Sequence, residues 1–249
     1  MLRRVKDLRG FAIRATDSEM GQVEQFYFDD ETWAIRYLVT NTGGWLVGRQ
    51  VLISPIAVTE TDWEGKQLEV ALTKQQVENS PDIDAHKPVS RQREAEYHSY
   101  YEYPYYWGGP LLWGPADRSR DVVRSRAGKP LRAAMAADGD SHLRSTNEVT
   151  GYHIEATDGE IGHVEDFIVE DETWAIRYML VDTRNWWPGK KVLVSPQWIK
   201  RVSWTDSKVY IDLSQEAVRN SPEYDESALV SRQYESSLYD HYGRPRYWS

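Results

Sequence analysis

The stretch "DETWAIRY" occurs twice in this chain of 249 residues, at Asp30–Tyr37 and again at Asp171–Tyr178. Eight identical residues in a row do not recur by chance in a chain of this length, so the two stretches mark an internal repeat. The copies lie 141 residues apart, and the same offset aligns residues 2–107 with residues 143–248 without a gap. Two copies of about 100 residues are each long enough to fold, which predicts two domains rather than a short-period solenoid.

The composition excludes several classes of protein. The net charge of -9, with no strongly basic segment, argues against a protein built to bind a nucleic-acid backbone. The chain has no cysteine, so it has no disulfide framework and no thiolate chemistry. The first residues, "MLRRVKDLRG", are basic but no apolar segment follows them, and no apolar run approaches the roughly 18 residues of a membrane helix. We therefore expect a cytoplasmic protein.

Short strands are predicted along each repeat. In the second repeat, runs of alternating or β-branched residues are separated by turns that contain Gly, Pro, Asp or Ser. Six strands are expected, at residues 152–157, 163–170, 174–183, 191–196, 198–204 and 208–213. A short helix follows, with Ser214 as its N-cap and Pro222 beyond its end. The first repeat shows the same series, and so many short strands in about 75 residues predict a small barrel.

Each repeat ends in an aromatic-rich tail, residues 90–107 in the first and 231–248 in the second. The first half of each tail predicts a helix, whereas its Tyr, Pro and Trp residues do not. Because Tyr and Trp suit half-wet interfaces, we expect the tails to pack on their own or the other barrel. Residues 108–142 are poor in strand signals and predict a linker with one short helix. The expected domains are thus a first module at 1–107 and a second at 143–249.

Four motifs recur in the same order in both repeats: a Thr-Asp-Ser/Gly turn, a Gly-x-Val strand, a Trp-x-Ile-Arg-Tyr strand and a Val-Leu-Ile/Val-Ser-Pro strand. Together they resemble the PRC-barrel family over about 75 residues of each half. The resemblance implies two tandem SH3-like β-barrels, each followed by a short helix, that dock or assemble proteins rather than catalyse a reaction. The family includes the cytoplasmic domain of the photosynthetic reaction centre H subunit of purple bacteria, one domain of a ribosome-maturation factor, and stand-alone bacterial proteins with two such barrels.

The resemblance leaves more than one function open. The first expectation is a non-catalytic bacterial scaffold or adaptor that docks a protein partner, with attachment to the inner membrane only through that partner. One alternative is a peripheral component of photosynthetic electron transfer, although Thr32 and Thr173 stand where the H subunit carries a proton-relaying acid. A second alternative is an RNA- or ribosome-linked assembly factor. Pairing of the two barrels, or a homodimer, is a further expectation.

The repeated "DETWAIRY" stretch supplies four candidate partner-binding residues. Glu31 and Arg36, with their copies Glu172 and Arg177, could form a polar site, because an arginine recognises a carboxylate through two parallel hydrogen bonds. The competing interpretation is a turn followed by a strand whose arginine pairs with a nearby acid of the same barrel.

The loops "TGGWLVGRQ" and "TRNWWPGKK" supply three further candidates, Trp45 in the first repeat and Trp186 and Trp187 in the second. A tryptophan in a loop between two strands is a typical interface anchor. The alternative is that these rings cap the barrel or pack on the tail.

No sequence feature predicts catalysis, a cofactor or a metal. A nucleophile elbow, a P-loop and a dinucleotide-binding glycine pattern are all missing from the sequence. The turns "ATDSEMG" and "ATDGEIG" carry two acids each, fewer than a calcium loop needs. The six histidines do not cluster, and the register expected for the strands of His153 and His163 places each opposite a different residue.

Overall fold

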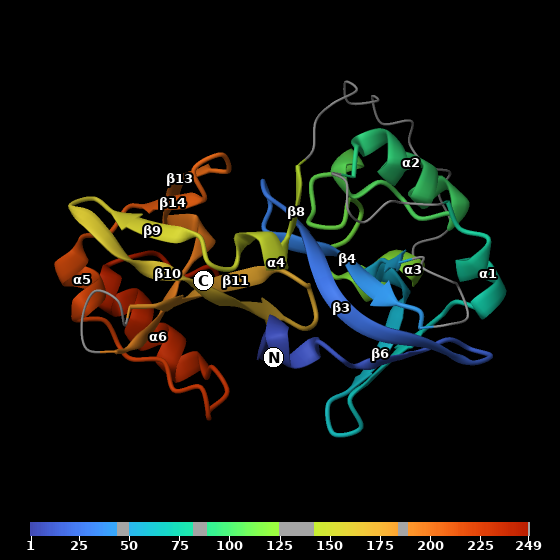
Figure 1. Ribbon diagram of the computed structural model, residues 1–249, viewed down its shortest axis with the longest axis horizontal. Coiled ribbons are helices and arrows are strands. Elements are labelled where there is room, and N and C mark those ends of the chain that lie inside the picture. Colours follow the sequence, from blue (N-terminus) through green and yellow to red (C-terminus); the bar gives the residue numbers. More distant parts are fainter. Residues whose placement is uncertain (44–49, 82–88, 125–141, 184–188, 249) are drawn as a thin grey trace. The chain divides into compact units, whose positions relative to one another are not determined.

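The computed structural model describes residues 1–43, 50–81, 89–124, 142–183 and 189–248, and the chain forms two compact units (Figure 1). Unit 1 consists of Met1–Lys6, Glu148–Asp171 and Ile176–Ser249, and unit 2 consists of Asp7–Asn147 and Glu172–Ala175. Each unit contains one sheet of seven strands. This confirms the predicted fold class, mainly β with two barrel-like domains.

Unit 2 is built on the strands of the first repeat. Its strands are β2 (Ala12–Arg14), β3 (Glu19–Asp29), β4 (Ala34–Asn41), β5 (Gln50–Ile53), β6 (Val58–Asp62), β7 (Gln67–Val70) and β8 (Leu143–Ser145). They are ordered β5-β4-β3-β2-β7-β6, and β8 pairs with β3 outside this path. Both faces of β4 are covered, since all its residues except the last are buried.

Unit 1 repeats this topology. Its strands are β1 (Leu2–Arg4), β9 (His153–Ala156), β10 (Gly159–Glu170), β11 (Ile176–Asp182), β12 (Lys191–Val194), β13 (Ile199–Ser203) and β14 (Lys208–Ile211). Their order is β12-β11-β10-β9-β14-β13, and β1 pairs with β10. All six strands expected from the second repeat are therefore present. The one parallel pair of each sheet, β9 with β14 and β2 with β7, was not predicted.

The glycine of the Gly-x-Val motif is required by the close approach of two strands. Gly21 in β3 has φ +129°, and a Cβ built on it would lie 2.0 Å from the backbone oxygen of Asn41 in β4. Gly162 in β10 repeats the arrangement, with φ +140° and the same 2.0 Å from the oxygen of Asp182. Any side chain at these positions would push apart the longest strand pair of its unit.

Short helices follow the strands. Unit 2 contains the 3-10 helices η2 (Pro55–Ala57) and η3 (Tyr106–Gly108) and the α-helices α1 (Lys74–Glu78), α2 (Arg91–Tyr100) and α3 (Ser119–Arg124). Unit 1 contains η4 (Pro196–Trp198), α5 (Gln215–Arg219) and α6 (Arg232–Tyr242), while η1 (Val5–Leu8) and α4 (Thr146–Val149) lie at the unit boundaries. Ser214 caps α5 as predicted, because its side chain accepts a hydrogen bond from the backbone of Ala217. Among the described residues, no helix combines the length and apolarity that a membrane crossing needs.

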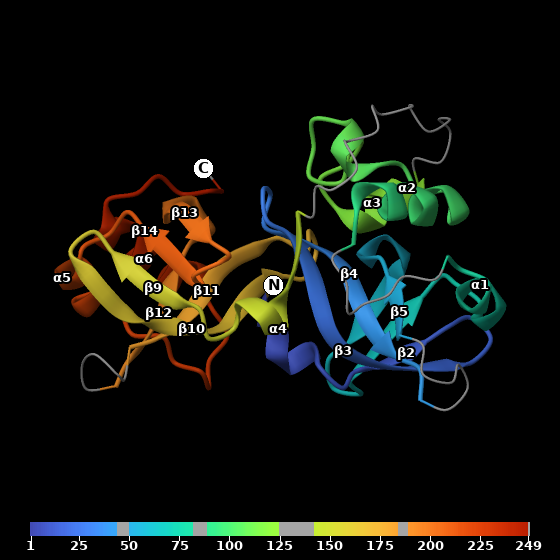
Figure 2. The ribbon, with the colours of Figure 1, turned by 45° about the horizontal axis from the view of Figure 1, so that its top comes forward.

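The first strand of each repeat lies in the sheet of the other repeat. Strand β1 pairs with β10 of unit 1, where Leu2 lies opposite Glu170. Strand β8 pairs with β3 of unit 2, where Leu143 lies opposite Asp29. Figures 1 and 2 both show β8, in yellow-green, running beside the blue β3. Each sheet is therefore completed by a strand that the repeat period assigns to the other copy.

The units differ from the modules expected at 1–107 and 143–249. Residues 1–6 belong to unit 1, and residues 108–124, expected to be part of the linker, belong to unit 2, where α3 forms. The reason is that a sequence period shows which residues are duplicated but not which strands pair. The two first strands read "LRR" and "LRS", so their sequences do not tell which sheet each strand joins.

The first residue of "DETWAIRY" anchors the exchanged strand. In unit 2, Asp30 accepts a hydrogen bond from Arg144 Nε at 2.9 Å, and its backbone N–H donates to the oxygen of His142. In unit 1, Asp171 accepts from the amino group of Met1, and its backbone N–H donates to the Met1 oxygen. The repeated aspartate therefore holds a strand end in both units.

The exchange predicts where a core mutation acts. Leu2 is 7% exposed, and replacing a buried leucine by alanine costs about 2–5 kcal/mol. We expect Leu2→Ala to accelerate hydrogen exchange along β10 of unit 1 while leaving β3 unchanged, as measured by mass spectrometry.

The matched variant is Leu143→Ala, at the same position of the second repeat, which should accelerate exchange along β3 and spare β10. A faster exchange of β3 in Leu2→Ala would mean that each first strand pairs within its own repeat, contrary to the structure.

Candidate functional site

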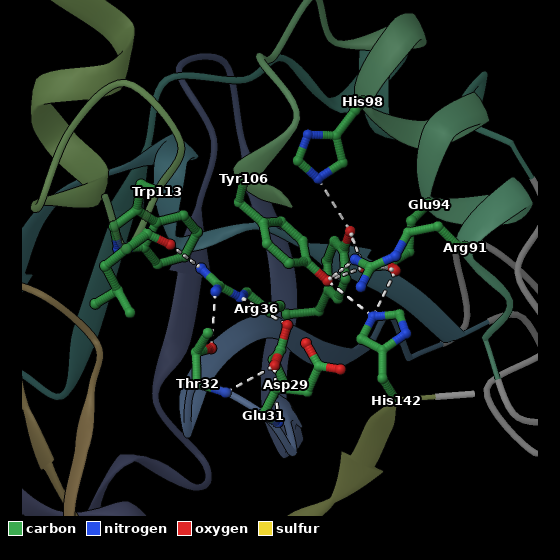
Figure 3. A network of polar contacts seen from close by, with 12 residues as sticks. Asp29, Glu31, Thr32, Arg36, Arg91, Glu94, His98, Tyr106, Trp113 and His142 are labelled. Atoms are coloured by element: carbon green, nitrogen blue, oxygen red, sulfur yellow. Dashed lines mark hydrogen bonds and ion pairs between the residues drawn. The ribbon is translucent and has the colours of Figure 1, made fainter. Parts of the chain in front are cut away.

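A buried carboxylate on helix α2 of unit 2, that of Glu94, contacts polar groups of strand β4, of the tail and of His142, the residue before strand β8 (Figure 3). Glu94 is 0% exposed. Its Oε1 accepts hydrogen bonds from the hydroxyl groups of Tyr37 in β4, at 3.0 Å, and Tyr106 in η3, at 2.6 Å. Its Oε2 lies 2.9 Å from His142 Nε2 and 3.2 Å from Arg91 Nη1. A charge removed from water needs such partners, and here they come from four separate parts of the chain.

The cluster shifts the pKa values of its members. Burial raises the pKa of the Tyr37 and Tyr106 hydroxyls, and the negative charge of Glu94 adds to the effect. Burial opposes protonation of His142, but the hydrogen bond and the charge of Glu94 outweigh it and raise its pKa. The tyrosines therefore stay neutral donors, and the carboxylate of Glu94 favours the protonated form of His142.

A second histidine, His98 on α2, is also buried, but its pKa is lowered whereas that of His142 is raised. It is 1% exposed, and its ring nitrogens lie 2.9 Å from the Pro104 oxygen and 3.1 Å from the Tyr37 hydroxyl. Burial is the main cause that lowers its pKa to about 4. Because the carbonyl oxygen of Pro104 can only accept, the Nδ1 of neutral His98 carries the proton.

Arg36 in β4 forms a second polar site on the other side of Tyr106. Its guanidinium is 1% exposed and lies between two rings, 3.8 Å from the centroid of Tyr106 and 4.9 Å from that of Trp113. Its Nη1 donates to the backbone oxygen of Leu112 at 2.7 Å, and its Nη2 donates to Thr32 Oγ1 at 2.9 Å. The arginine thus binds a short segment of the same chain by a hydrogen bond and by stacking.

The carboxylate beside Arg36, that of Asp29, mainly accepts hydrogen bonds from the backbone of the following turn. Asp29 Oδ2 lies 3.8 Å from Arg36 Nε, while Oδ1 accepts hydrogen bonds from the backbone N–H groups of Glu31 and Thr32. The next residue, Trp33, has φ 55°, as Trp174 does at the same place of the second repeat, where φ is 60°. The turn is therefore a specific structure that both repeats share.

The segment bound by Arg36 is a tight turn around Trp113, which is 0% exposed. The backbone N–H of Trp113 donates to the oxygen of Ala116, and Leu111 and Gly114 form an isolated bridge. Its indole Nε1 donates to the backbone oxygen of Thr173, which is part of unit 2, at 2.8 Å. The buried ring and its satisfied N–H fix this segment on unit 2.

Unit 1 contains the same framework with fewer covering groups. Glu235 on α6 accepts hydrogen bonds from Tyr178 in β11 and Tyr247 in the tail, both at 2.8 Å, and lies 3.0 Å from Arg232. Each of these residues is 141 positions after its counterpart in unit 2. Tyr239 stands where unit 2 has His98, so this histidine is specific to unit 2. Both tails pack on their own barrel.

Arg177, the counterpart of Arg36, is less enclosed. Its Nε donates to Glu170 Oε2 at 3.1 Å, and the ring of Tyr247 lies 4.3 Å from its guanidinium carbon. The side chain is 24% exposed, against 1% for that of Arg36.

The other sequence candidates lie in different surroundings. Glu31 is exposed at the turn. Glu172 is 43% exposed and lies 3.0 Å from Arg118 within unit 2. Trp45, Trp186 and Trp187 lie outside the described residues. The structure thus brings the repeated arginines together with aromatic rings rather than with the repeated glutamates.

Sequence reasoning missed the central acids and the covering residues. Glu94 and Glu235 left a signal, because the offset of 141 preserves an acid at this position of both tails. Trp113 and His142 left none that the repeat could show, since Trp113 lies outside the aligned stretch of residues 2–107 and 143–248, and His142 aligns with Met1.

The expected register of His153 and His163 is wrong. The two residues lie directly opposite each other on β9 and β10, because a bulge between Glu160 and Gly162 shifts the register by one residue. His153 Nδ1 lies 2.8 Å from Glu160 Oε1. Within the described ranges, no group of three or more His, Asp or Glu side chains is placed to hold a metal ion.

The two histidines of unit 2 predict opposite pH effects. The folded-state pKa of His98 is about 4, below its ordinary value of 6.5, so the unfolded chain binds a proton first as the pH falls. Its contribution to stability is complete above pH 6.5 and is lost between pH 6.5 and 4, by about 3 kcal/mol. Denaturant unfolding of unit 2 should show this acid loss, and His98→Gln should reduce it.

The raised pKa of His142 acts in the other direction. Its contribution is present below about pH 6.5 and is lost as the pH rises through the folded-state value, so His142→Gln should cost stability in acid and little in base. If both variants keep the pH profile of the wild type, neither histidine is coupled to folding.

Removing the central acid should release the tail. Glu94→Ala leaves two hydroxyl groups and Arg91 without their acceptor, which should cost about 3–5 kcal/mol and shift the tryptophan emission to the red as Trp107 becomes wetter. Glu96→Ala is the control, since Glu96 is 43% exposed on the same helix and pairs with Arg93, an interaction worth about 0–1 kcal/mol. Equal effects of the two substitutions would contradict a special role for Glu94.

Comparison with known proteins agrees with this architecture. The family model for the PRC-barrel domain matches residues 2–77. An uncharacterized protein of Deinococcus radiodurans is 42% identical over 82 residues, which cover 32% of this chain and 27% of that protein. The match thus spans only about a quarter of the relative's length. The match to the PRC-barrel domain thus covers residues 2–77, of which residues 7–77 lie in unit 2 and β1 lies in the sheet of unit 1.

Proposed function

We propose that this protein is a non-catalytic adaptor whose units bind segments of partner proteins. The observation that carries the proposal is the contact between Arg36 and the turn at Leu112–Trp113. There the unit holds a peptide segment through a carbonyl oxygen, at 2.7 Å, and an aromatic ring stacked on the guanidinium. Such contacts recognise a polypeptide by features that a partner protein could also present.

The state of the buried acids supports a structural rather than a catalytic role. Glu94 already lies against four donor groups, and Glu235 against three. A carboxylate in this position joins parts of the fold, whereas a general acid or base must reach a substrate with its titrating atom. Glu94 and Glu235 are therefore assigned to the framework of the units.

We also propose a cytoplasmic location, with any contact to a membrane supplied by the partner. A role in photosynthetic electron transfer and one in ribosome assembly rest on the family resemblance alone. The Arg36 contact supports protein docking more directly than either of them.

The proposal is tested by isolating the partner. The tagged full-length chain, purified from its native host under gentle conditions, should retain a protein identifiable by mass spectrometry. The purified partner should then re-form a complex of fixed stoichiometry with the purified chain, as measured by light scattering. Failure to re-form any complex, or a substrate-dependent activity of the chain alone, would overturn the adaptor function.

A further inference from the structure

Arg36 and its counterpart Arg177 differ in the number of aromatic rings that stack on the guanidinium. In unit 2, both faces of the Arg36 guanidinium are stacked, on Tyr106 and on Trp113. In unit 1, Arg177 stacks on Tyr247, at 4.3 Å, and among the described residues no second ring lies on its other face. Among the described residues, none in unit 1 takes the place on the arginine that Trp113 takes in unit 2.

The hydrogen-bonding atoms show the same difference. Arg36 uses Nη1 to bind the Leu112 oxygen. Arg177 directs Nε and Nη2 to Glu170, and its Nη1 has no partner among the described residues. The same donor atom that binds a peptide carbonyl in unit 2 is thus unpaired in the described part of unit 1.

The surrounding residues are also more accessible in unit 1. The side chain of Arg232 is 53% exposed, whereas that of its counterpart Arg91 is 12% exposed. Tyr247 is half-buried, whereas its counterpart Tyr106 is buried. The framework residues are the same in both units, so the difference comes from what covers them.

We propose that unit 1 binds a turn of a partner protein that carries a tryptophan directly after a residue with a free carbonyl oxygen, on the face formed by Arg177, Tyr247 and Arg232. The tryptophan ring stacks on the open side of Arg177, and the preceding carbonyl accepts a hydrogen bond from Nη1, as Trp113 and Leu112 do in unit 2. This inference rests on the proposed adaptor function and names the chemistry of its ligand.

The occupant of unit 2 supplies the probe. A fluorescein-labelled peptide with the sequence of residues 109–119, GPLLWGPADRS, is titrated with the full-length chain, and binding is followed by fluorescence anisotropy. Saturable binding is expected. It should weaken at least about tenfold when the peptide tryptophan is replaced by alanine, or when the protein carries Arg177→Ala, since each change removes a charge-assisted or stacking contact.

Two further variants separate loss of binding from loss of folding. Arg177→Lys keeps a positive charge beside Glu170 but loses the planar stacking surface, so it should also weaken binding if Arg177→Ala proves unstable. Arg201→Ala is the matched control, because Arg201 lies 3.6 Å from the centroid of Tyr210 in the same unit, outside the proposed face. This variant should bind like the wild type.

The inference is overturned if the peptide does not bind at about 1 mM, or if folded Arg177→Ala binds it as tightly as the wild type. The second result would mean that the peptide acts elsewhere, for example by replacing its own sequence on Arg36. Should the native partner still bind while the peptide does not, only this inference fails. Should no partner bind the chain at all, the adaptor function itself fails.

Discussion

A carboxylate buried on the tail helix holds each unit together. Glu94 joins α2 to the Tyr37 hydroxyl of β4 and to the Tyr106 hydroxyl of the tail, and Glu235 does the same in unit 1. Desolvating such a charge is unfavourable, and only a nearly complete set of donors offsets that cost. The helix and the tail therefore cannot shift separately, because a displacement of either would leave a buried acid without a donor. The aromatic tails are therefore structural parts of the units.

Duplication has kept this framework and changed what surrounds it. The acid, its two tyrosines and the strand arginine recur with the same offset in both repeats. Unit 2 adds His142 beside the acid and Trp113 over the arginine, and both are nearly inaccessible. The copies thus differ at the edges of the site, where a change alters accessibility and titration without breaking the fold. Such positions allow two similar units to diverge in function.

Features of the fold that depend on neighbouring residues could be predicted from the sequence, and features that depend on distant contacts could not. Strand positions, the Ser214 cap and the helical half of the tails depend on neighbouring residues, and the sequence patterns located them. The parallel pair of β9 and β14 and the exchange of β1 depend on contacts far apart in the chain, which a repeat period does not encode. The predicted register of His153 and His163 was wrong for a third reason. A single bulge shifts the register by one residue, and the alternation of apolar and polar residues does not show it. In the site, Arg36 and Arg177 were found because they repeat, whereas Trp113 lies outside the aligned stretch of the repeats and was missed.

The strand exchange also affects the order of events during synthesis. Residues 1–6 are translated long before their partner strand β10, which is made only when residues 159–170 are translated. At about 5–20 residues per second, that delay is roughly 8–30 s, during which β1 has no ladder to join. Most of unit 2 lies between these two points of the chain, so its strands β2 to β7 can pair while β1 waits. A short, charged strand such as "LRR" is suited to that interval, because its two arginines keep an unpaired edge soluble.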